Sequence, residues 1–198
     1  MPLARTPWRP RPGLRIAVVA LALLAAGSSG ASSRIALDTA LSQIGFTLKT
    51  RWGQTLEGHF PSWHGEIVVL DDGRHQVRLL LPTREVEISG SRNFTRITRG
   101  PGFFDAERYP EMLFVSDPYP GTLARDGGEM AGVLSIRGVR QRETFTIAAS
   151  ECVRPALDCD VVGQGNVRRS RYAMDRWSYA LSDEVRFTLR IRAAADPD

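Results

Sequence analysis

Apolar and polar residues alternate along much of this chain, and the clearest run lies near the C-terminus. There, apolar side chains at odd positions alternate with polar side chains at even positions: Val185, Phe187, Leu189 and Ile191 against Arg186, Thr188, Arg190 and Arg192. A period of two places successive side chains on opposite faces of a β-strand. The same alternation occurs at residues 44–48, 77–81, 134–136 and 145–147. The pattern therefore predicts a chain built mainly from half-buried strands.

Turn-forming residues separate these predicted strands at short intervals. They are Asp71-Asp72-Gly73, Pro118 to Gly121, Asp126-Gly127-Gly128 and Arg137-Gly138. Gly, Asp and Pro favour the tight turns that link neighbouring antiparallel strands. Several short strands with this punctuation are typical of an antiparallel barrel or sandwich. Because neither a low-complexity linker nor an internal repeat interrupts them, residues 32–198 are expected to form one domain.

One segment departs from the strand pattern. Ser91 is placed to cap a short helix from Arg92 to about Arg99, in which Phe94 and Ile97 share one face. Gly100-Pro101-Gly102 is expected to end this helix. A helical insert in a β chain either covers one end of a barrel as a lid or simply fills the core, and the sequence leaves both interpretations open.

Two adjacent aromatic residues, Phe103 and Phe104, follow this helix in a short polar turn. Tyr109-Pro110 ends the turn, because proline lacks an amide hydrogen and biases its predecessor towards extended geometry. Two exposed phenylalanine rings would leave a costly apolar patch. We therefore expect at least one ring to point inward and close an apolar opening.

The N-terminus has the residue order of a secretory signal peptide. Arg5, Arg9, Arg11 and Arg15 precede an apolar run at 16–26, and small residues fill 27–33. A run of this length is too short to span a bilayer, which takes about 20 residues. The expected cleavage follows Ala31, with Gly27 as the rival position, and an uncleaved membrane anchor is the competing interpretation. Cleavage predicts a leader at 1–31 and a mature chain exported to the periplasm.

Removal of the leader changes the charge of the protein. The 198 residues include 26 Lys and Arg and 22 Asp and Glu, a net charge of +4. The leader accounts for this excess, because its four arginines are accompanied by no acidic residue. A neutral mature chain has no general attraction for nucleic acid. The cluster of Arg168, Arg169 and Arg171 is accordingly interpreted as a solvated strand end rather than a phosphate site.

Two cysteines, Cys152 and Cys159, flank a six-residue segment that resembles a hairpin loop. In an oxidising periplasm a local disulfide is the expected state. Closing so short a loop would stabilise the fold by roughly 2–3 kcal/mol in the chain-entropy model. Two unpaired thiols are the alternative, and no histidine lies nearby in sequence to favour a metal site.

The residues that catalysis usually needs are sparse. His59 and His64 would lie on opposite faces of a regular strand, and a zinc site would still need a third ligand. No Gly-x-Ser-x-Gly segment occurs, and Gly163-Gln164-Gly165 precedes no predicted helix. We therefore expect no catalytic residues, no metal and no cofactor. A Ser-His-Asp site assembled in space remains open, since its members need only meet in the fold.

Residues 103–116 follow the pattern FF-D-x-x-x-YP-x-x-x-F-x-S, and further patterned segments lie at 42–48, 56–60, 65–67, 132–139 and 163–170. Together these segments resemble those of the YceI-like family of periplasmic lipid-binding proteins. Their order and spacing from about Ile35 to Ile191 carry the resemblance. It implies a mainly β fold, an extended eight-stranded antiparallel lipocalin-like barrel with a short helical insert at one end. Asn93 and Tyr172-Ala173 depart from the residues that many relatives carry near the head group and after the penultimate strand.

The resemblance also implies a function. It points to a non-catalytic periplasmic carrier that holds a long isoprenoid lipid, a quinone or a polyprenyl phosphate, in a barrel tunnel. An envelope-stress protein-interaction module without bound lipid and an uncharacterised hydrolase are the alternatives. Nucleic acid and stable membrane insertion after cleavage are not expected, and a homodimer is compatible with the sequence.

The residues expected to contact the isoprenoid share an apolar side chain on the predicted inward face or in the aromatic turn. Each of them has the simpler alternative of filling the core. They are Phe46, Leu48, Phe60, Leu79, Leu81, Phe94, Phe103, Phe104, Phe114, Leu134, Ile136, Phe145, Ile147, Phe187 and Leu189.

Overall fold

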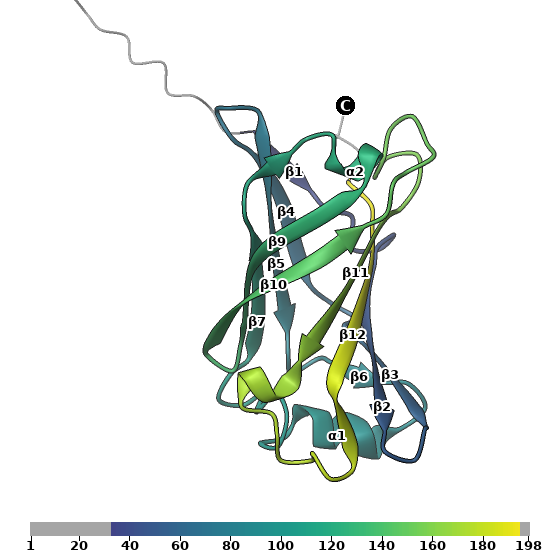
Figure 1. Cartoon of the computed structure of the whole chain (residues 1–198), viewed down its shortest axis with the longest axis vertical. Helices are drawn as coiled ribbons and strands as arrows, with labels where there is room; N and C mark the ends of the chain where they lie inside the picture. The colour runs from purple at the N-terminus through teal and green to yellow at the C-terminus, as the bar shows by residue number, and fades with distance from the viewer. Residues whose placement is uncertain (1–32, 195–198) are drawn as a thin grey trace, which may run out of the picture. The chain divides into compact units, whose positions relative to one another are not determined.

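The computed structural model describes residues 33–194, so the predicted leader lies outside the described residues. Twelve strands in this region form one curled antiparallel sheet (Figure 1). They are β1 (Arg34–Ala36), β2 (Gln43–Thr50), β3 (Thr55–His59), β4 (His64–Val69), β5 (Arg74–Pro82), β6 (Glu87–Ile88), β7 (Glu111–Ser116), β8 (Tyr119–Pro120), β9 (Gly128–Ile136), β10 (Val139–Ile147), β11 (Val161–Arg168) and β12 (Leu181–Ile191). The helical elements are α1 (Arg92–Arg99), α2 (Leu123–Asp126) and the 3-10 helix η1 (Arg169–Tyr172).

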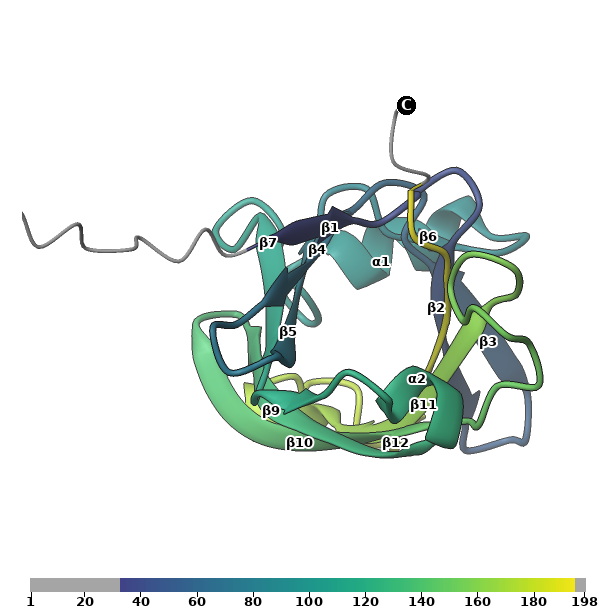
Figure 2. The same ribbon diagram turned by 90° about the horizontal axis from the view of Figure 1, so that it is seen from above.

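The sheet curls around an interior, and this confirms the predicted barrel class. Its strand order is β1-β4-β5-β7-β9-β10-β11-β12-β2-β3-β6, with β8 beside β5. The strands β3 and β4 follow one another through residues 60–63, and the Phe60 amide still donates to the Ile44 carbonyl at 3.0 Å. The covalent link at 60–63 therefore connects β3 and β4, which lie near opposite edges of the sheet. Viewed from above, the strands form a ring (Figure 2).

The strand count differs from the predicted eight for local reasons. Pro61 lies between β3 and β4, and a proline removes a donor from the hydrogen-bond ladder. Counted as one interrupted strand, β3 and β4 complete a set of eight with β2, β5, β7, β9, β10, β11 and β12. The short strands β1, β6 and β8 are added to that set. Tyr119–Pro120, expected within a turn, instead pairs with β5 as β8.

The predicted alternation places the expected side chains in the core. On β2, Ile44, Phe46 and Leu48 are buried, and on β12 Val185 and Phe187 are buried. Phe46 and Phe187 are directly opposed in the register of these two strands. Gly58 lies opposite Phe46 on β3, and a Cβ atom there would overlap the Phe46 ring. The glycine therefore leaves the space that the ring occupies.

The predicted helix forms within the expected bounds. The Ser91 hydroxyl accepts a hydrogen bond from the Phe94 amide at 3.2 Å, and Gly100 caps the C-terminus of α1. A second short helix, α2, and the 3-10 helix η1 were not predicted, because four residues are too few to show a helical period. No helix among the described residues is both long and apolar enough to cross a membrane.

The two ends of the barrel carry different elements (Figure 1). We call one the helix end; it consists of α1, the β2–β3 turn at 49–55 and the loop at 173–180. We call the other the disulfide end; it consists of the β4–β5 turn at 70–73, α2 and the loop at 148–160. The disulfide-end loop joins β10 to β11 and contains the predicted bond between Cys152 and Cys159, which the structure confirms.

Candidate functional site

The barrel interior holds two cavities with predominantly apolar walls. The disulfide-end chamber has a volume of about 750 Å³, and the helix-end chamber a volume of about 210 Å³. Along one strand, the inward-facing residues near one end line one chamber, and those near the other end line the other chamber. On β2, Ile44 lines the disulfide-end chamber and Leu48 the helix-end chamber, with Phe46 between them. The boundary between the chambers therefore crosses β2 near Phe46.

Four phenylalanine rings occupy this boundary, and we call them the aromatic layer: Phe46, Phe60, Phe104 and Phe187. The Phe46 ring centroid lies 5.8 Å from that of Phe187 and 5.9 Å from that of Phe60. Phe104 lies edge-on to Phe60 at 6.1 Å and to Phe46 at 6.4 Å. These separations and tilts are those of favourable aromatic pairs. Phe187 lines both chambers, so the layer separates them.

The disulfide-end chamber is formed by the inward faces of β5, β7, β9, β10 and β12. Phe114 and Phe145 meet edge-on in its wall, with ring centroids 5.1 Å apart. Of the residues predicted to contact a ligand, those lining this chamber are Leu79, Leu81, Phe114, Leu134, Phe145, Ile147, Phe187 and Leu189. The predicted inward face and the chamber wall therefore coincide along these strands.

Two polar rings also line the disulfide-end chamber, and sequence reasoning missed both. The rings of His75 and Tyr119 meet edge-on, with centroids 6.0 Å apart. The Tyr119 phenol is protonated at neutral pH and can donate a hydrogen bond, and burial raises its pKa further, to about 12. The inward orientation of His75 was predictable, because it lies two residues before Val77 on β5 and therefore shares its face. Tyr119 was hidden in a segment that looked like a simple turn.

The helix-end chamber holds most of the other predicted residues. Phe103 and Phe104 are both buried, which confirms the expected inward orientation of the aromatic turn. The predicted residues that line this chamber are Phe46, Leu48, Phe94, Phe103, Phe104, Ile136 and Phe187. Phe60 lines neither chamber and instead packs within the aromatic layer. Trp52, Met174 and Trp177 also line the chamber; they come from turns and loops, where no periodicity marks an inward side chain.

Arg169 lies in the wall of the helix-end chamber, and the interpretation of its cluster as a solvated strand end was wrong for this residue. Its relative exposure is 1%, and its guanidinium lies over the Phe103 ring at 5.6 Å. The guanidinium donates to the carbonyl oxygens of Ser182 at 2.7 Å, Leu181 at 3.3 Å and Met174. Burial lowers its pKa. Its inward direction continues the alternation of β11, in which Val167 is buried and Arg168 is exposed.

The neighbouring arginine has a different environment. Arg171 forms an ion pair with the buried carboxylate of Glu143 at 3.0 Å, and the Tyr172 hydroxyl donates to the same carboxylate oxygen at 2.9 Å. Burial, reinforced by this hydrogen bond, raises the pKa of Tyr172. Glu143 therefore fastens η1 to β10 and serves a structural purpose in the wall of the barrel.

The histidines do not converge. His59 and His64 are both exposed on the outside of the barrel, where His59 lies 3.6 Å from Glu87, and His75 alone lines a chamber. Among residues 33–194, no cluster of three or more His, Cys, Asp or Glu side chains is arranged to hold a metal ion. In the same region, no histidine forms a hydrogen bond with a serine or cysteine side chain.

Comparisons with known proteins agree with this architecture. A family model described as the YceI-like domain matches residues 36–193. A search of curated proteins finds no match. The chain is similar in structure to Burkholderia cenocepacia BcnA, with a TM-score of 0.62 and 19% identity over 80% of this chain and 99% of that one.

Two further solved structures share the fold. One is a polyisoprenoid-binding domain from Saccharophagus degradans implicated in plant cell wall breakdown, with a TM-score of 0.58 and 13% identity over 82% of this chain and 99% of that one. The other is a Campylobacter jejuni YceI protein, with a TM-score of 0.50 and 17% identity over 70% of this chain and 85% of that one. At these identities the structures show a shared fold.

Proposed function

The chain belongs to the family of YceI-like domains, and from this premise we propose that it binds a long isoprenoid lipid and carries it, without catalysis, in the periplasm. The observation that carries the proposal is the disulfide-end chamber of about 750 Å³, walled mainly by aliphatic and phenylalanine side chains. That volume lies within the range of about 300–1,000 Å³ found for small-molecule sites. A structural relative described as a polyisoprenoid-binding domain supports the same ligand class.

Burial of the tail is the proposed binding mechanism. Transfer of a methylene group from water to an apolar site contributes about 0.8 kcal/mol, so a branched hydrocarbon tail gains affinity with every unit enclosed. At about 30 Å³ for each water-sized group, a five-carbon isoprene unit fills about 150 Å³. The disulfide-end chamber then accommodates on the order of five isoprene units. A longer tail would have to pass the aromatic layer into the helix-end chamber.

The polar end of the ligand is proposed to lie near Tyr119 and His75. The Tyr119 phenol is protonated at neutral pH, as an ordinary tyrosine is, and its burial raises its pKa further, to about 12. A protonated phenol donates a hydrogen bond to a quinone carbonyl or to a phosphate oxygen. These two rings are therefore the groups that would orient the head group, while the tail occupies the apolar walls.

Mass spectrometry of an organic extract tests the proposal. Protein purified from the periplasmic fraction should begin near Ser32 and release an isoprenoid lipid in an amount close to one molecule per chain. An empty protein that brings a protein partner would favour the interaction module instead. Turnover of an ester substrate that disappears when one polar residue is replaced would favour the hydrolase. Either outcome would contradict the carrier.

A further inference from the structure

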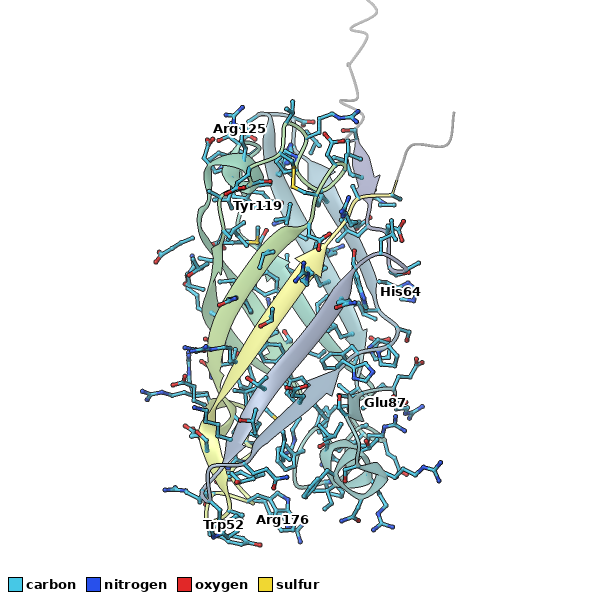
Figure 3. All side chains as sticks on the ribbon, turned by 90° about the vertical axis from the view of Figure 1, so that its right-hand side faces the viewer. Trp52, His64, Glu87, Tyr119, Arg125 and Arg176 are labelled. Carbon is cyan, nitrogen blue, oxygen red and sulfur yellow. A yellow bond between two sulfur atoms is a disulfide. The ribbon has the colours of Figure 1, made fainter. Side chains whose placement is uncertain are left out.

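The charges of this protein are separated between the two ends of the barrel. The three segments of the helix end hold six cationic side chains, Lys49, Arg51, Arg92, Arg96, Arg99 and Arg176, and a single carboxylate, Asp175. The adjoining segments at 83–91 and 100–110 add two cationic side chains, Arg84 and Arg108, and four carboxylates, Glu85, Glu87, Asp105 and Glu107. The three segments of the disulfide end hold two cationic side chains, Arg125 and Arg154, and six carboxylates, Asp71, Asp72, Asp126, Glu151, Asp158 and Asp160. Figure 3 shows Arg176 and Arg125 at opposite ends. With its adjoining segments, the helix end therefore has a net positive charge, eight cationic side chains against five carboxylates.

The cations of the two ends also differ in their partners. At the disulfide end, Arg154 pairs with Asp158 at 2.7 Å and Arg125 with Asp126 at 2.9 Å. At the helix end, Arg51 donates to the Ser178 carbonyl at 3.1 Å and Arg99 to the Val86 carbonyl at 2.9 Å. None of the six helix-end cations forms an ion pair with a carboxylate of the described residues. Their positive charge is therefore available to an external anion.

Exposed aromatic side chains accompany this positive charge. Trp52, in the β2–β3 turn, is 78% exposed, and Tyr179, in the loop before β12, is 70% exposed. Tyr179 packs against Trp177, with ring centroids 5.9 Å apart. Figure 3 shows Trp52 and Arg176 together at the tip of the helix end. Tryptophan and tyrosine combine an apolar ring with one polar atom, which suits them to the boundary between a bilayer and water.

We propose that the helix end docks on an anionic lipid bilayer. Basic residues near an anionic membrane surface contribute about 1 kcal/mol each, and inserted aromatic rings add the burial of their apolar surface. The disulfide end exposes apolar groups of its own, such as Val153 and Leu157. Its carboxylates, however, are largely neutralised: Asp72 pairs with Arg74, and Asp160 pairs with Arg190 and Arg192. The disulfide end therefore offers no comparable attraction to an anionic surface. Charge thus selects which end meets the bilayer.

Docking by this end would place the mouth of the helix-end chamber against the membrane. Trp52, Phe94 and Trp177 line that chamber and belong to the three segments that would touch the bilayer. This consequence rests on the proposed function, because an isoprenoid lipid resides in the bilayer from which a carrier must collect it. A lipid that enters through the helix-end chamber must cross the aromatic layer to reach the disulfide-end chamber. The docking itself needs no bound isoprenoid and is tested without one.

Sedimentation with vesicles tests the docking. The purified protein should bind vesicles of equal parts phosphatidylglycerol and phosphatidylcholine, and its binding should weaken as salt is raised. Vesicles of phosphatidylcholine alone should bind it much less. Replacing two helix-end cations, Arg92→Gln with Arg96→Gln, should weaken partitioning roughly 30-fold, the equivalent of about 1 kcal/mol per arginine. Trp52→Ser should weaken it as well.

A matched control is available at the other end. Val153 is 89% exposed in the disulfide-end loop, and Val153→Ser should leave vesicle binding unchanged. Equal binding to neutral and anionic vesicles would overturn the proposal, as would loss of binding in Val153→Ser but not in Trp52→Ser. Salt-sensitive binding to DNA without binding to vesicles would overturn it too. Isoprenoid retention, measured on the same variants, separates failure of the docking from failure of the carrier function.

Discussion

At the residue scale, Phe104 lies in the aromatic layer between the two chambers. Its ring packs against Phe46 and Phe60, and it also faces the helix-end chamber. Phe60 belongs to the same aromatic layer but lines neither chamber. Phe60 and Phe104 therefore have the same side chain and nearly the same burial, but only Phe104 lines a cavity.

This difference predicts different outcomes for two truncations. Phe60→Ala should destabilise the empty protein by about 3–5 kcal/mol, the usual range for a core phenylalanine. Phe104→Ala should destabilise it less, because part of that ring already faces a cavity, and it should open the layer between the chambers. Phe104→Ala should then bind longer competing isoprenoid alcohols than the wild type does, whereas Phe60→Ala should not. Identical length preferences in both variants would show that Phe104 does not divide the interior.

Individual side chains were predictable where a strand fixed their direction. Leu79 and Leu134 lie where their parity places them, because neighbours two residues apart share a face. Arg169 also continues the inward parity of Val167 on β11, but its charge argued for a solvated position. Tyr119 was not predictable in this way, because it lies on a two-residue strand. Its pairing with β5, rather than a local period, sets the direction of its side chain.

At the element scale, the disulfide-end loop contributes to the wall of the larger chamber. Pro155, Ala156 and Leu157 line that chamber. The Ala156 carbonyl accepts a hydrogen bond from the Ala193 amide at 2.9 Å, which ties the loop to the chain beyond β12. The bond between Cys152 and Cys159 restrains the segment from which these contacts are made.

Loss of this disulfide should therefore lower the stability of the folded protein. Closing a loop of this length contributes roughly 2–3 kcal/mol in the chain-entropy model, so Cys152→Ser with Cys159→Ser should lower the melting temperature by roughly 4–12 °C. The measurement compares the melting temperatures of the oxidised wild-type protein and of the variant. Reductant should lower the melting temperature of the wild type and leave that of the variant unchanged. An equal response of both proteins would contradict a stabilising role.

How well the sequence predicts an element depends on the length of that element. Strands β2, β5, β9, β10 and β12 are each long enough to show several periods of alternation. Strands β1, β6 and β8 and helix α2 have between two and four residues, which is too few for any period to appear. Helix α1 was predictable because Ser91 and Gly100 mark its two ends.

At the scale of the whole molecule, the protein combines an apolar interior with an asymmetric surface. The curled sheet surrounds two chambers, and the larger one opens towards the disulfide end, where the exposed Ile35 and Leu157 are among its lining residues. The cations and exposed aromatic rings lie at the other end. Neither the division into chambers nor the separation of charge follows from composition, because both depend on which loops the topology brings to the same end.

The most direct test of the central claim fills the larger chamber and measures isoprenoid binding. Leu189 lines that chamber, whereas Thr188, the next residue on β12, does not. Titration of delipidated protein with a fluorescent farnesyl probe should show binding to the wild type and to Thr188→Trp. The affinity of folded Leu189→Trp should be at least about tenfold weaker, because its indole would occupy space that the tail needs. Equal affinity in all three proteins, or no binding to the wild type, would contradict the account.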